Sequence, residues 1–478
     1  MKFTHQWLLQ HIPTDLTPQA IGERLTLAGL ELEGLTDLRQ GLEQVQVGRL
    51  LAVAPHPDAD RLTLCQVQVG AEQLSIVCGA QNHRSGDRVA VARVGAVLAN
   101  GLTIQRSRIR GQLSEGMLCS QAELGLAGSS DGILILPPET VDGLPLAEVL
   151  GRNDHLFELS LTPNRGDCLG VRGIARELGA LTQTPLHPLP VAAPEVQSQQ
   201  EMVRIEDAEG CPRYAGRIVR GVRIAPSPEW LRLRLESVGI RSINNVVDIT
   251  NYILLDLNQP LHAFDLARLH LPLQIRRARS GERLRTLDGV ERLLNEEMTV
   301  IADSQHPLAL AGIMGGEESG VTAETTDLFL ESAWFEPIRI ARTGRRLGIN
   351  SDSRHRFERG TDPEGLLLAL ERATQWILEL AGGTAEPILW ADTGRWSPLP
   401  PVSMRPQRIN RLGGVALTPE GMATMLGHLG CRLVAQEGES MTFQPPSHRH
   451  DLRREEDLLE EVIRLHGYDQ VQTSLPRL

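Results

Sequence analysis

The middle of the chain contains a histidine and a glutamate that could take part in hydrolysis. His262 lies between a proline turn and an apolar residue in the segment QPLHAFD, and Glu331 ends an apolar run in FLES. The glycine-rich segment GIMGGE at 312–317 could line a pocket between them. A histidine and a glutamate that converge on such a pocket could orient water and bind a polar group of a substrate. Taken singly, each residue is more typical of a hydrogen-bonded structural position.

A second candidate is a group of arginines that could bind phosphates. Asp87 is the only acidic residue between positions 84 and 110, and six arginines occupy the same stretch. They are Arg84, Arg88, Arg93, Arg106, Arg108 and Arg110. The last three alternate, so on a β-strand they would share one face and could follow a nucleic-acid backbone. A solvated strand face is the alternative, and charge alone favours it.

A third candidate is a group of carboxylates near the end of the sequence. Its members are Asp451, Asp457, Glu460 and Glu461. The last three have i, i+3, i+4 spacing, which predicts that they share one face of a helix that begins near Asp451. Mg²⁺ prefers oxygen ligands of this kind. A solvated acidic face is the alternative interpretation.

The segments around these candidates predict a multidomain α+β protein. Short strands with glycine turns at 45–120 are typical of a β-barrel. The proline-rich and glutamine-rich stretch at 184–200 reads as a linker, and a second proline-rich stretch at 396–406 leads to a short final domain. The predicted parts are a barrel at 40–150, a small α+β domain at 1–39 plus 151–190, a mixed α/β domain at 205–390 and a second small α+β domain at 402–476.

An internal repeat suggests that the two small domains share a fold. The segments LTPQ at 16–19 and LTPE at 417–420 each predict a helix with a threonine N-cap and a proline in the first turn. Each copy also contains an Arg-x-Asp motif before a later helix.

Alignment of the copies on Asp167 and Asp451 places Gly173, Arg176 and Glu177 against positions 457, 460 and 461. The first copy therefore lacks the acidic cluster, which favours a functional role for it in the second.

Composition excludes several functional classes. The 478 residues are 41% hydrophobic and 23% charged, which is ordinary for a globular protein, and the net charge of −12 still permits a local basic face. Lys2 is the only lysine, which excludes a Walker-type phosphate loop. The six cysteines form no CxxC pair, which argues against a zinc site. Without a signal peptide or a bilayer-spanning run, a cytoplasmic protein is expected.

Taken in order, the motifs resemble the β subunits of bacterial phenylalanyl-tRNA synthetases. The matching segments are MKFTHQWLLQHI, HPDADRL, CGAQN, LTPNRGDCLGVRGIARELGA, NVVDITNYILLDLNQPLHAFD, GIMGGEESGV and PPSHRHDLRREEDLLEEVIRLHGYD. They cover essentially the whole chain. The family continues into an inactive catalytic-like domain and an anticodon-binding domain, so the chain is expected to be the N-terminal part, either as a fragment or as a truncated gene product.

The resemblance implies roles for the domains and for single residues. The barrel would be an OB-fold tRNA-binding domain, 205–390 a B3/B4-like domain that hydrolyses mischarged tyrosyl-tRNA, and 402–476 a B5-like domain. The family's editing-site positions correspond to Arg241, His262, Gly315, Glu331, Ser351 and Ser353. The family usually has threonine and alanine at the last two. Glu331 would accept a hydrogen bond from the tyrosine phenol.

The resemblance also implies partners and cofactors. The four acids near the end would bind Mg²⁺ at a site shared with the α subunit, in a complex of two α and two β subunits that acts on tRNA-Phe. The glycine-rich ATP-site motifs of class II synthetases are missing, so ATP would bind to α and aminoacylation would occur there. A free-standing hydrolase of mischarged tRNA and a simple tRNA-binding module are the alternatives that the sequence leaves open.

Overall fold

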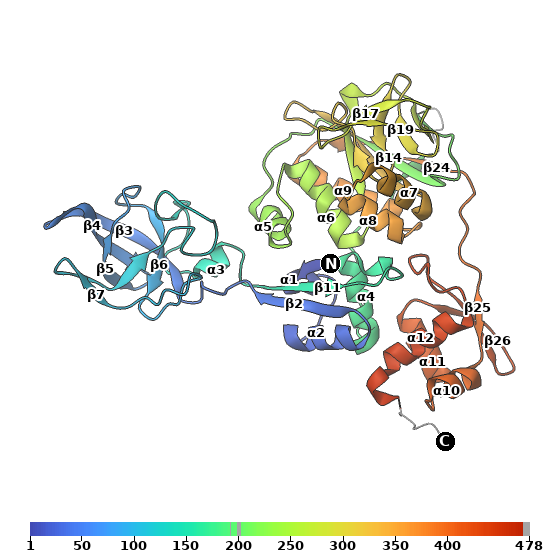
Figure 1. Cartoon of the computed structure of the whole chain (residues 1–478), viewed down its shortest axis with the longest axis horizontal. Helices are drawn as coiled ribbons and strands as arrows, with labels where there is room; N and C mark the ends of the chain where they lie inside the picture. Colours follow the sequence, from blue (N-terminus) through green and yellow to red (C-terminus); the bar gives the residue numbers. More distant parts are fainter. Residues whose placement is uncertain (192, 198–201, 472–478) are drawn as a thin grey trace. The chain divides into compact units, whose positions relative to one another are not determined.

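A computed structural model describes residues 1–191, 193–197 and 202–471 of the chain, which divides into two compact units (Figure 1). One unit is Thr36–Leu156, and the other combines Met1–Leu35 with the chain from Phe157 onward. Part of the predicted linker at 184–200 and the predicted domain end at 476 lie outside the described residues. In the described part of the chain, no helix is long and apolar enough to cross a membrane.

The unit at Thr36–Leu156 is built around a curved antiparallel sheet. Its path runs through β10 (Ile135–Leu136), β6 (Arg88–Arg93), β3 (Val45–His56), β4 (Ala59–Val69) and β5 (Glu72–Cys78), and β9 (Gly116–Leu118) also pairs with β6. The sheet closes where the Glu115 amide donates to the Ser75 carbonyl at 2.9 Å. A short hairpin, β7 (Ser107–Ile109) and β8 (Gln112–Ser114), and helix α3 (Leu146–Val149) complete the unit. Because this stretch contains no Phe, Trp or Tyr, its core is aliphatic.

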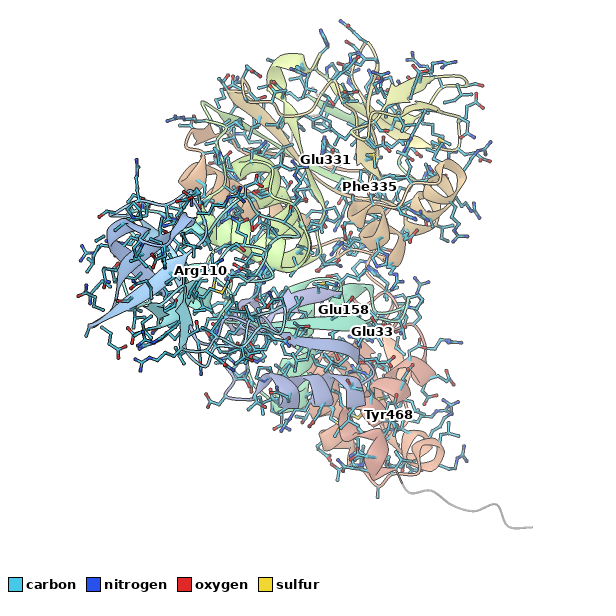
Figure 2. All side chains as sticks on the ribbon, turned by 60° about the vertical axis from the view of Figure 1, so that its left-hand side comes forward. Glu33, Arg110, Glu158, Glu331, Phe335 and Tyr468 are labelled. Atoms are coloured by element: carbon cyan, nitrogen blue, oxygen red, sulfur yellow. The ribbon has the colours of Figure 1, made fainter. Side chains whose placement is uncertain are left out.

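The other unit contains two parts with the same order of elements and the same sheet order. The first part consists of β1 (Lys2–Thr4), α1 (His5–Leu9), α2 (Pro18–Leu27), β2 (Glu31–Asp37), β11 (His155–Ser160) and α4 (Val171–Thr182), with a 3₁₀ turn at Gly166–Cys168. The second consists of β25 (Val402–Met404), α10 (Pro406–Gly413), α11 (Pro419–His428), β26 (Arg432–Glu437), β27 (Ser440–Gln444) and α12 (Glu455–His466), followed by a 3₁₀ turn at Tyr468–Gln470. The sheet orders are β1-β11-β2 and β25-β27-β26. In Figure 2, Glu33 and Glu158 mark the sheet of the first part.

Helix N-caps in the two copies form as the repeat predicts. The Thr17 hydroxyl accepts a hydrogen bond from the Ala20 amide at 3.3 Å at the start of α2. The Thr418 hydroxyl accepts one from the Gly421 amide at 3.1 Å at the start of α11. Proline occupies the first turn of both helices, where its missing N–H leaves no bond unmade.

Between the two repeats in sequence lies a body with two sheets. The first sheet has the order β12 (Val196–Gln197), β24 (Ile388–Asp392), β14 (Arg213–Arg220), β22 (Asp327–Trp334) and β15 (Leu261–Asp265), with β23 (Thr384–Ala385) also paired to β14. The second has the order β13 (Val203–Ile205), β16 (Leu273–Arg277), β19 (Thr299–Ala302), β20 (Pro307–Leu310) and β21 (Met314–Gly315). A hairpin, β17 (Arg283–Arg285) and β18 (Glu291–Leu293), and a 3₁₀ turn at Leu266–Arg268 lie beside them in sequence. The helices are α5 (Glu229–Ser237), α6 (Asn245–Leu257), α7 (Pro337–Leu347), α8 (Asp352–Arg359) and α9 (Leu366–Leu380).

The apolar core of this body lies between its two sheets. Tyr214, Phe264 and Phe329 from the first sheet pack in one buried cluster with Ile275 and Val300 from the second. Helices α6 and α9 pack against strands of the first sheet. Side chains that point from β14, β15 and β22 toward the second sheet are therefore removed from water, and any polar group among them needs an internal partner.

A buried ionic cluster forms the centre of the first repeat. Arg165 binds Asp167 through two hydrogen bonds of 3.1 and 3.0 Å and binds Glu177 at 2.6 Å. Possible ligand atoms of Asp167, Cys168 and Glu177 lie within 4.8 Å of one another, which no other group of three such residues in the described part does. Arg165 donates to all three, so its guanidinium supplies the positive charge at this point.

The second repeat has the same cluster, and an arginine joins the two. Arg449 binds Asp451 through two hydrogen bonds of 2.8 Å and binds Glu461 at 2.9 Å. Arg464 donates both to Glu461 and to Glu177 of the first repeat. Burial alone would raise the pKa of Glu461, but Arg449 and Arg464 hold it at about 2. The carboxylate is thus ionised and fully paired inside the protein.

Candidate functional site

A pocket of about 490 Å³ opens in the two-sheet body. Five of the six residues predicted for a hydrolytic site line it, namely His262, Gly315, Glu331, Ser351 and Ser353. They come from β15, β21, β22 and the beginning of α8, which are far apart in the sequence. Figure 2 shows Glu331 inside this body. The remaining wall is largely apolar.

The histidine and the glutamate are direct cross-strand neighbours. His262 on β15 is paired in register with Glu331 on β22, so both side chains lie on the same face of the sheet. The Nε2 atom of His262 is buried and has no hydrogen-bond partner among the described residues. Glu331 is 5% exposed, and its one hydrogen bond in the described part is a long contact from the Tyr214 hydroxyl, at 3.5 Å.

Burial makes both groups neutral near pH 7. It lowers the pKa of His262 to about 4, because the charged imidazolium would lose its hydration. It raises the pKa of Glu331 to about 8, although the Tyr214 hydrogen bond lowers that value in part. A protonated carboxyl offers a donor as well as an acceptor, and a neutral imidazole offers one of each. The site therefore suits an uncharged polar group such as a hydroxyl.

Small residues form the pocket wall. A Cβ atom at Gly315 would lie 2.4 Å from Cε1 of His262, so only glycine leaves room for the ring in its present place. The Ser351 hydroxyl donates to the Ile313 carbonyl at 2.6 Å, and the Ser353 hydroxyl donates to the Gly312 carbonyl at 3.1 Å. The two serines thus hold the loop that leads to Gly315.

Arg241 is the predicted site residue that does not line the pocket. It is exposed and has no ion pair in the described part of the chain. It lies two residues before Ile243, which does line the pocket, in the segment that leads to α6. Arg241 is therefore close to the cavity in sequence, but it is not part of the lining.

The six predicted phosphate-binding arginines fall into two groups. Arg88 pairs with Asp142 at 3.0 Å, and Arg93 pairs with Glu72, so these two belong to the framework of the sheet. The other four are exposed at the surface, and these are Arg84, Arg106, Arg108 and Arg110.

The strand that carries the last arginines is shorter than predicted. Strand β7 is Ser107–Ile109, and Arg110 lies in the turn after it with a left-handed φ of 48°. Arg106, Arg108 and Arg110 therefore do not form a regular row on one strand. Arg106 also pairs with Glu115. All three still project from one short hairpin, and Arg110 is labelled in Figure 2.

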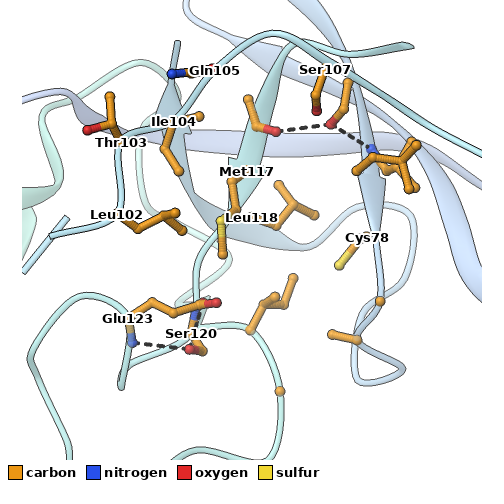
Figure 3. A pocket seen from close by; sticks show the side chains of 18 of the residues that line it. Cys78, Leu102, Thr103, Ile104, Gln105, Ser107, Met117, Leu118, Ser120 and Glu123 are labelled. Carbon is orange, nitrogen blue, oxygen red and sulfur yellow. Dashed lines mark hydrogen bonds between the residues drawn. The ribbon is translucent and has the colours of Figure 1, made fainter. Parts of the chain in front are cut away.

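The hairpin also borders a pocket that the sequence did not indicate. The pocket has a volume of about 640 Å³ and lies within the Thr36–Leu156 unit. Figure 3 shows Leu102, Met117 and Leu118 across the middle of the view, with Gln105 and Ser107 on one side of them and Ser120 and Glu123 on the other. Short and irregular segments form much of this wall, and no period of apolar residues marks such segments in a sequence.

The four acids near the end of the chain do not gather around one point. Asp451 and Glu461 bind Arg449 in the buried cluster. Asp457 accepts hydrogen bonds from the amides of residues 453 and 454, both at 2.8 Å, and so caps α12. Glu460 is exposed and has no ion pair in the described part of the chain. The helix begins at Glu455, so Asp451 precedes it by a full turn.

Comparison with known proteins gives three domain matches and many similar chains. Family models match residues 45–145 ("Putative tRNA binding domain"), 210–382 ("B3/4 domain") and 402–468 ("tRNA synthetase B5 domain"). The phenylalanine–tRNA ligase β subunits of Geobacter metallireducens and Syntrophus aciditrophicus are 46% and 44% identical to the chain over its whole length. The same subunit of Legionella pneumophila is 43% identical over 99% of the chain. The chain belongs to the phenylalanine–tRNA ligase β-subunit family. It spans about 60% of the length of each of these relatives.

Within this family member, the B3/4 match covers His262, Gly315, Glu331, Ser351 and Ser353. The B5 match covers the second repeat and the four acids, and the tRNA-binding match covers the arginine hairpin. Tyr214, which contacts Glu331, also lies within the B3/4 match but was not among the predicted site residues. The sequence carries no motif around it, because its role depends on a neighbouring strand more than a hundred residues away.

We expect the buried carboxyl of Glu331 to make the stability of the protein depend on pH. Its pKa in the folded state, about 8, is raised above the ordinary value of 4.5, so the folded state binds this proton more tightly than the unfolded state does. The contribution is fully present below pH 4.5 and is lost as pH rises toward 8. Between pH 5 and pH 8 the wild type should lose on the order of 3 kcal/mol of unfolding free energy through this carboxyl. Glu331→Gln should not show this loss, because its side chain is neutral at every pH.

Calorimetric unfolding at pH 5 and pH 8 measures this difference between the two proteins. Glu158→Gln is the matched control, since the Glu158 side chain is 44% exposed and pairs with Lys2 at the surface. Equal pH dependence of wild type and Glu331→Gln would show that the carboxyl is ionised in the folded protein.

Proposed function

We propose that the chain supplies tRNA binding and hydrolytic editing of mischarged tyrosyl-tRNA as the β subunit of a phenylalanine–tRNA ligase. Aminoacylation would occur on the α subunit, which would also bind ATP. The observation that carries the editing proposal is the pocket in which five family editing positions meet. The names of the relatives supply phenylalanine and tRNA, and the family resemblance supplies tyrosine as the mischarged amino acid. In the complete enzyme, two α and two β subunits would act together on tRNA-Phe.

The physical need for such a site follows from the limits of amino-acid selection. An apolar pocket that binds phenylalanine rejects an added hydroxyl poorly, so some tRNA receives tyrosine. A second site that hydrogen-bonds the hydroxyl discriminates far better, because its buried polar group stays unpaired when phenylalanine enters. Glu331 is such a group, since it is buried and has no cationic partner in the described part of the chain.

The proposed reaction is the hydrolysis of an ester. Water adds to the carbonyl carbon that joins tyrosine to the terminal ribose of the tRNA, and the bond from that carbon to the ribose oxygen breaks. The ribose oxygen takes a proton from the water, and the products are free tyrosine and uncharged tRNA. The unpaired Nε2 of His262 is suited to hold the water or the ester by a hydrogen bond. Exposed Arg241 would contact the tRNA outside the cavity.

The barrel unit would bind tRNA chiefly through phosphates. We assign it the OB fold that the family implies, and its match to a tRNA-binding domain supports this role. Base stacking on the rings of Phe, Trp or Tyr, which many OB folds use, is not open to this unit, because it contains none of these residues. The exposed arginines Arg84, Arg106, Arg108 and Arg110 are then the main candidates for contacts, whereas Arg88 and Arg93 support the sheet.

The structure reduces the number of acids that could bind Mg²⁺ from four to two. The buried arginines already neutralise Asp451 and Glu461, so a site that uses all four acids does not fit the observed contacts. Mg²⁺ commonly keeps several waters and uses one or two protein carboxylates. Asp457 and Glu460, which lie outside the buried arginine cluster, would then hold the ion at the interface with the α subunit. Asp457 would do so while it caps α12 and pairs with Arg454 at 3.4 Å at the surface.

A free-standing hydrolase is the second candidate function. One observation favours it, because the five editing positions that line the pocket all lie within the single B3/4 match. Hydrolysis of tyrosyl-tRNA by the chain without an α subunit would support this possibility. Hydrolysis only in the presence of α would support the role as a subunit.

We expect Glu331→Ala to abolish the preference for tyrosyl-tRNA, since it removes the group that pairs with the phenol. Gly315→Ala should lower the hydrolysis rate by about 10- to 100-fold, because the new methyl displaces the His262 ring. Release of labelled tyrosine from tRNA measures both effects. In the control Gly427→Ala, on α11 and outside the pocket, no atom lies within 4 Å of the added methyl, so a small effect is expected. Unchanged hydrolysis in Glu331→Ala would refute the assignment of this residue.

We expect alanine at Arg106, Arg108 and Arg110 to weaken tRNA binding by the loss of phosphate contacts. Each lost contact should reduce the slope of log affinity against log salt by about 0.9. Filter binding at several salt concentrations gives both quantities. The control carries alanine at Arg395, Arg411 and Arg432, three exposed arginines of the other unit, and loses the same net charge. Equal affinity and slope in the two triple variants would exclude the hairpin from binding.

We expect Glu460→Gln to affect Mg²⁺ binding and Glu461→Gln to affect the stability of the protein. Glu460→Gln should lower the affinity for Mg²⁺, measured by titration calorimetry, and leave the melting temperature unchanged, because the side chain is exposed. Glu461→Gln should lower the stability by about 3–5 kcal/mol, because Arg449 and Arg464 lose their shared counterion. If Glu460→Gln binds Mg²⁺ and the α subunit as wild type does, this helix holds no functional metal.

A further inference from the structure

Tyr214 lies on the strand next to Glu331 and on the same face of the sheet. Strands β14 and β22 are antiparallel, with Gly216 opposite Glu331 and Tyr214 opposite Ala333. Tyr214 is therefore the diagonal neighbour of Glu331, at a separation that a long side chain can bridge. Its side chain is completely buried. The position gives Tyr214 access to the carboxyl from the side opposite His262, which pairs with Glu331 from β15.

Among the described residues, the Tyr214 phenol and the Glu331 carboxyl are each other's one hydrogen-bond partner. The Tyr214 hydroxyl donates to Oε2 of Glu331 at 3.5 Å, and neither group has another hydrogen bond in the described part of the chain. The distance is long for a hydrogen bond between two oxygens. Hydrogen bonds in ligand-free sites are often long and shorten when a ligand is bound. The distance between the Tyr214 hydroxyl and Oε2 of Glu331 can therefore shorten when a ligand binds in the pocket.

The residue opposite Glu331 on β14 is a glycine, and an aromatic ring fills the place of its missing side chain. Gly216 has no side chain, and a Cβ atom there would lie 2.3 Å from the ring of Phe329. The Phe329 ring therefore occupies the space beside Gly216. No cation pairs with Glu331 in the described part of the chain, so the phenol is the one internal group that can orient the carboxyl.

We propose that Tyr214 is a positioning residue that holds Oε2 of Glu331 and so turns the other carboxyl oxygen, Oε1, toward the phenol of a tyrosyl group in the pocket. This inference rests on the proposed editing function and adds a specificity-determining residue to it. In the resulting chain of hydrogen bonds, the internal phenol donates to one carboxyl oxygen. The other oxygen carries the proton and donates to the phenol oxygen of the ligand, which replaces the acceptor role that the family resemblance implied for Glu331. A phenylalanyl group would leave that donor without a partner, at the cost of an unpaired buried polar group.

The test is Tyr214→Phe in the full 478-residue chain, with tRNA-Phe charged with either tyrosine or phenylalanine. The variant removes one oxygen and keeps the ring. The ratio of the two hydrolysis rates should fall about 3- to 10-fold, which is the range for one neutral hydrogen bond. The high-pH limb of tyrosyl-tRNA hydrolysis should also move upward, because the lost hydrogen bond had lowered the pKa of Glu331.

The matched control is Tyr252→Phe. Tyr252 is also buried, and its hydroxyl makes an equally long contact of 3.5 Å, but to Gln10 and not to the pocket. This variant should keep both the selectivity and the pH profile of the wild type. A merely structural role of Tyr214 would lower both hydrolysis rates alike and leave the pH profile in place.

A second measurement does not depend on the folding of Tyr214→Phe. The chain has three tyrosines, so carbon-13 at the ζ position gives three resonances. The Tyr214 resonance should shift with the ionisation of Glu331 and lose that shift in Glu331→Gln. Absence of the shift, or Tyr214→Phe with wild-type selectivity and pH profile, would overturn the inference while editing stands. A wild-type chain that hydrolyses no tyrosyl-tRNA, with or without α, would instead overturn the proposed function.

Discussion

The structure depends on one constraint, which is that a charged group buried away from water needs a partner of opposite charge. Two carboxylates, Glu177 and Glu461, approach each other inside the protein, and Arg464 makes that possible by donating to both. Without its guanidinium, two ionised groups would be buried together with too little positive charge. The arginine thereby fixes the distance between the repeats, since neither carboxylate can move away without losing a partner. A fully paired network of this kind specifies one arrangement, whereas apolar packing alone would tolerate several.

The same constraint has the opposite result at Glu331. No cation reaches this carboxyl in the described part of the chain, so burial acts without compensation and keeps the group protonated near neutral pH. Glu461 and Glu331 are thus buried to a similar degree, yet one is a permanent anion and the other a neutral hydrogen-bonding group. The difference lies entirely in the neighbours. An anion would hold its arginines tightly and exclude a neutral ligand, whereas a neutral carboxyl can exchange its partner for a substrate hydroxyl.

Local signals in the sequence predicted local structure well. The internal repeat also contained a signal for the buried position of Glu461. The threonine caps of α2 and α11 follow from short-range hydrogen bonds, which a few residues determine. The alignment of Glu461 with Glu177 already indicated that this acid belongs to the shared fold, yet spacing on α12 suggested a metal site. Helical spacing cannot distinguish a solvated face from one that meets a buried arginine of another segment. Likewise, Tyr214 and the barrel pocket depend on strands that pair across long stretches of chain, which no local pattern records.

The two kinds of site divide the proposed task by their physics. In the proposed function, the arginines of the hairpin would act at long range and on any phosphate, so they would provide affinity and speed of association but little choice between tRNAs. The pocket would act at contact distance on one hydroxyl, so it would provide choice but little affinity. Neither kind of site could replace the other, because desolvation makes the pocket selective and exposure makes the arginines available. A chain that must inspect one small group on a large, charged molecule therefore needs both a solvated basic surface and a dry, neutral cavity.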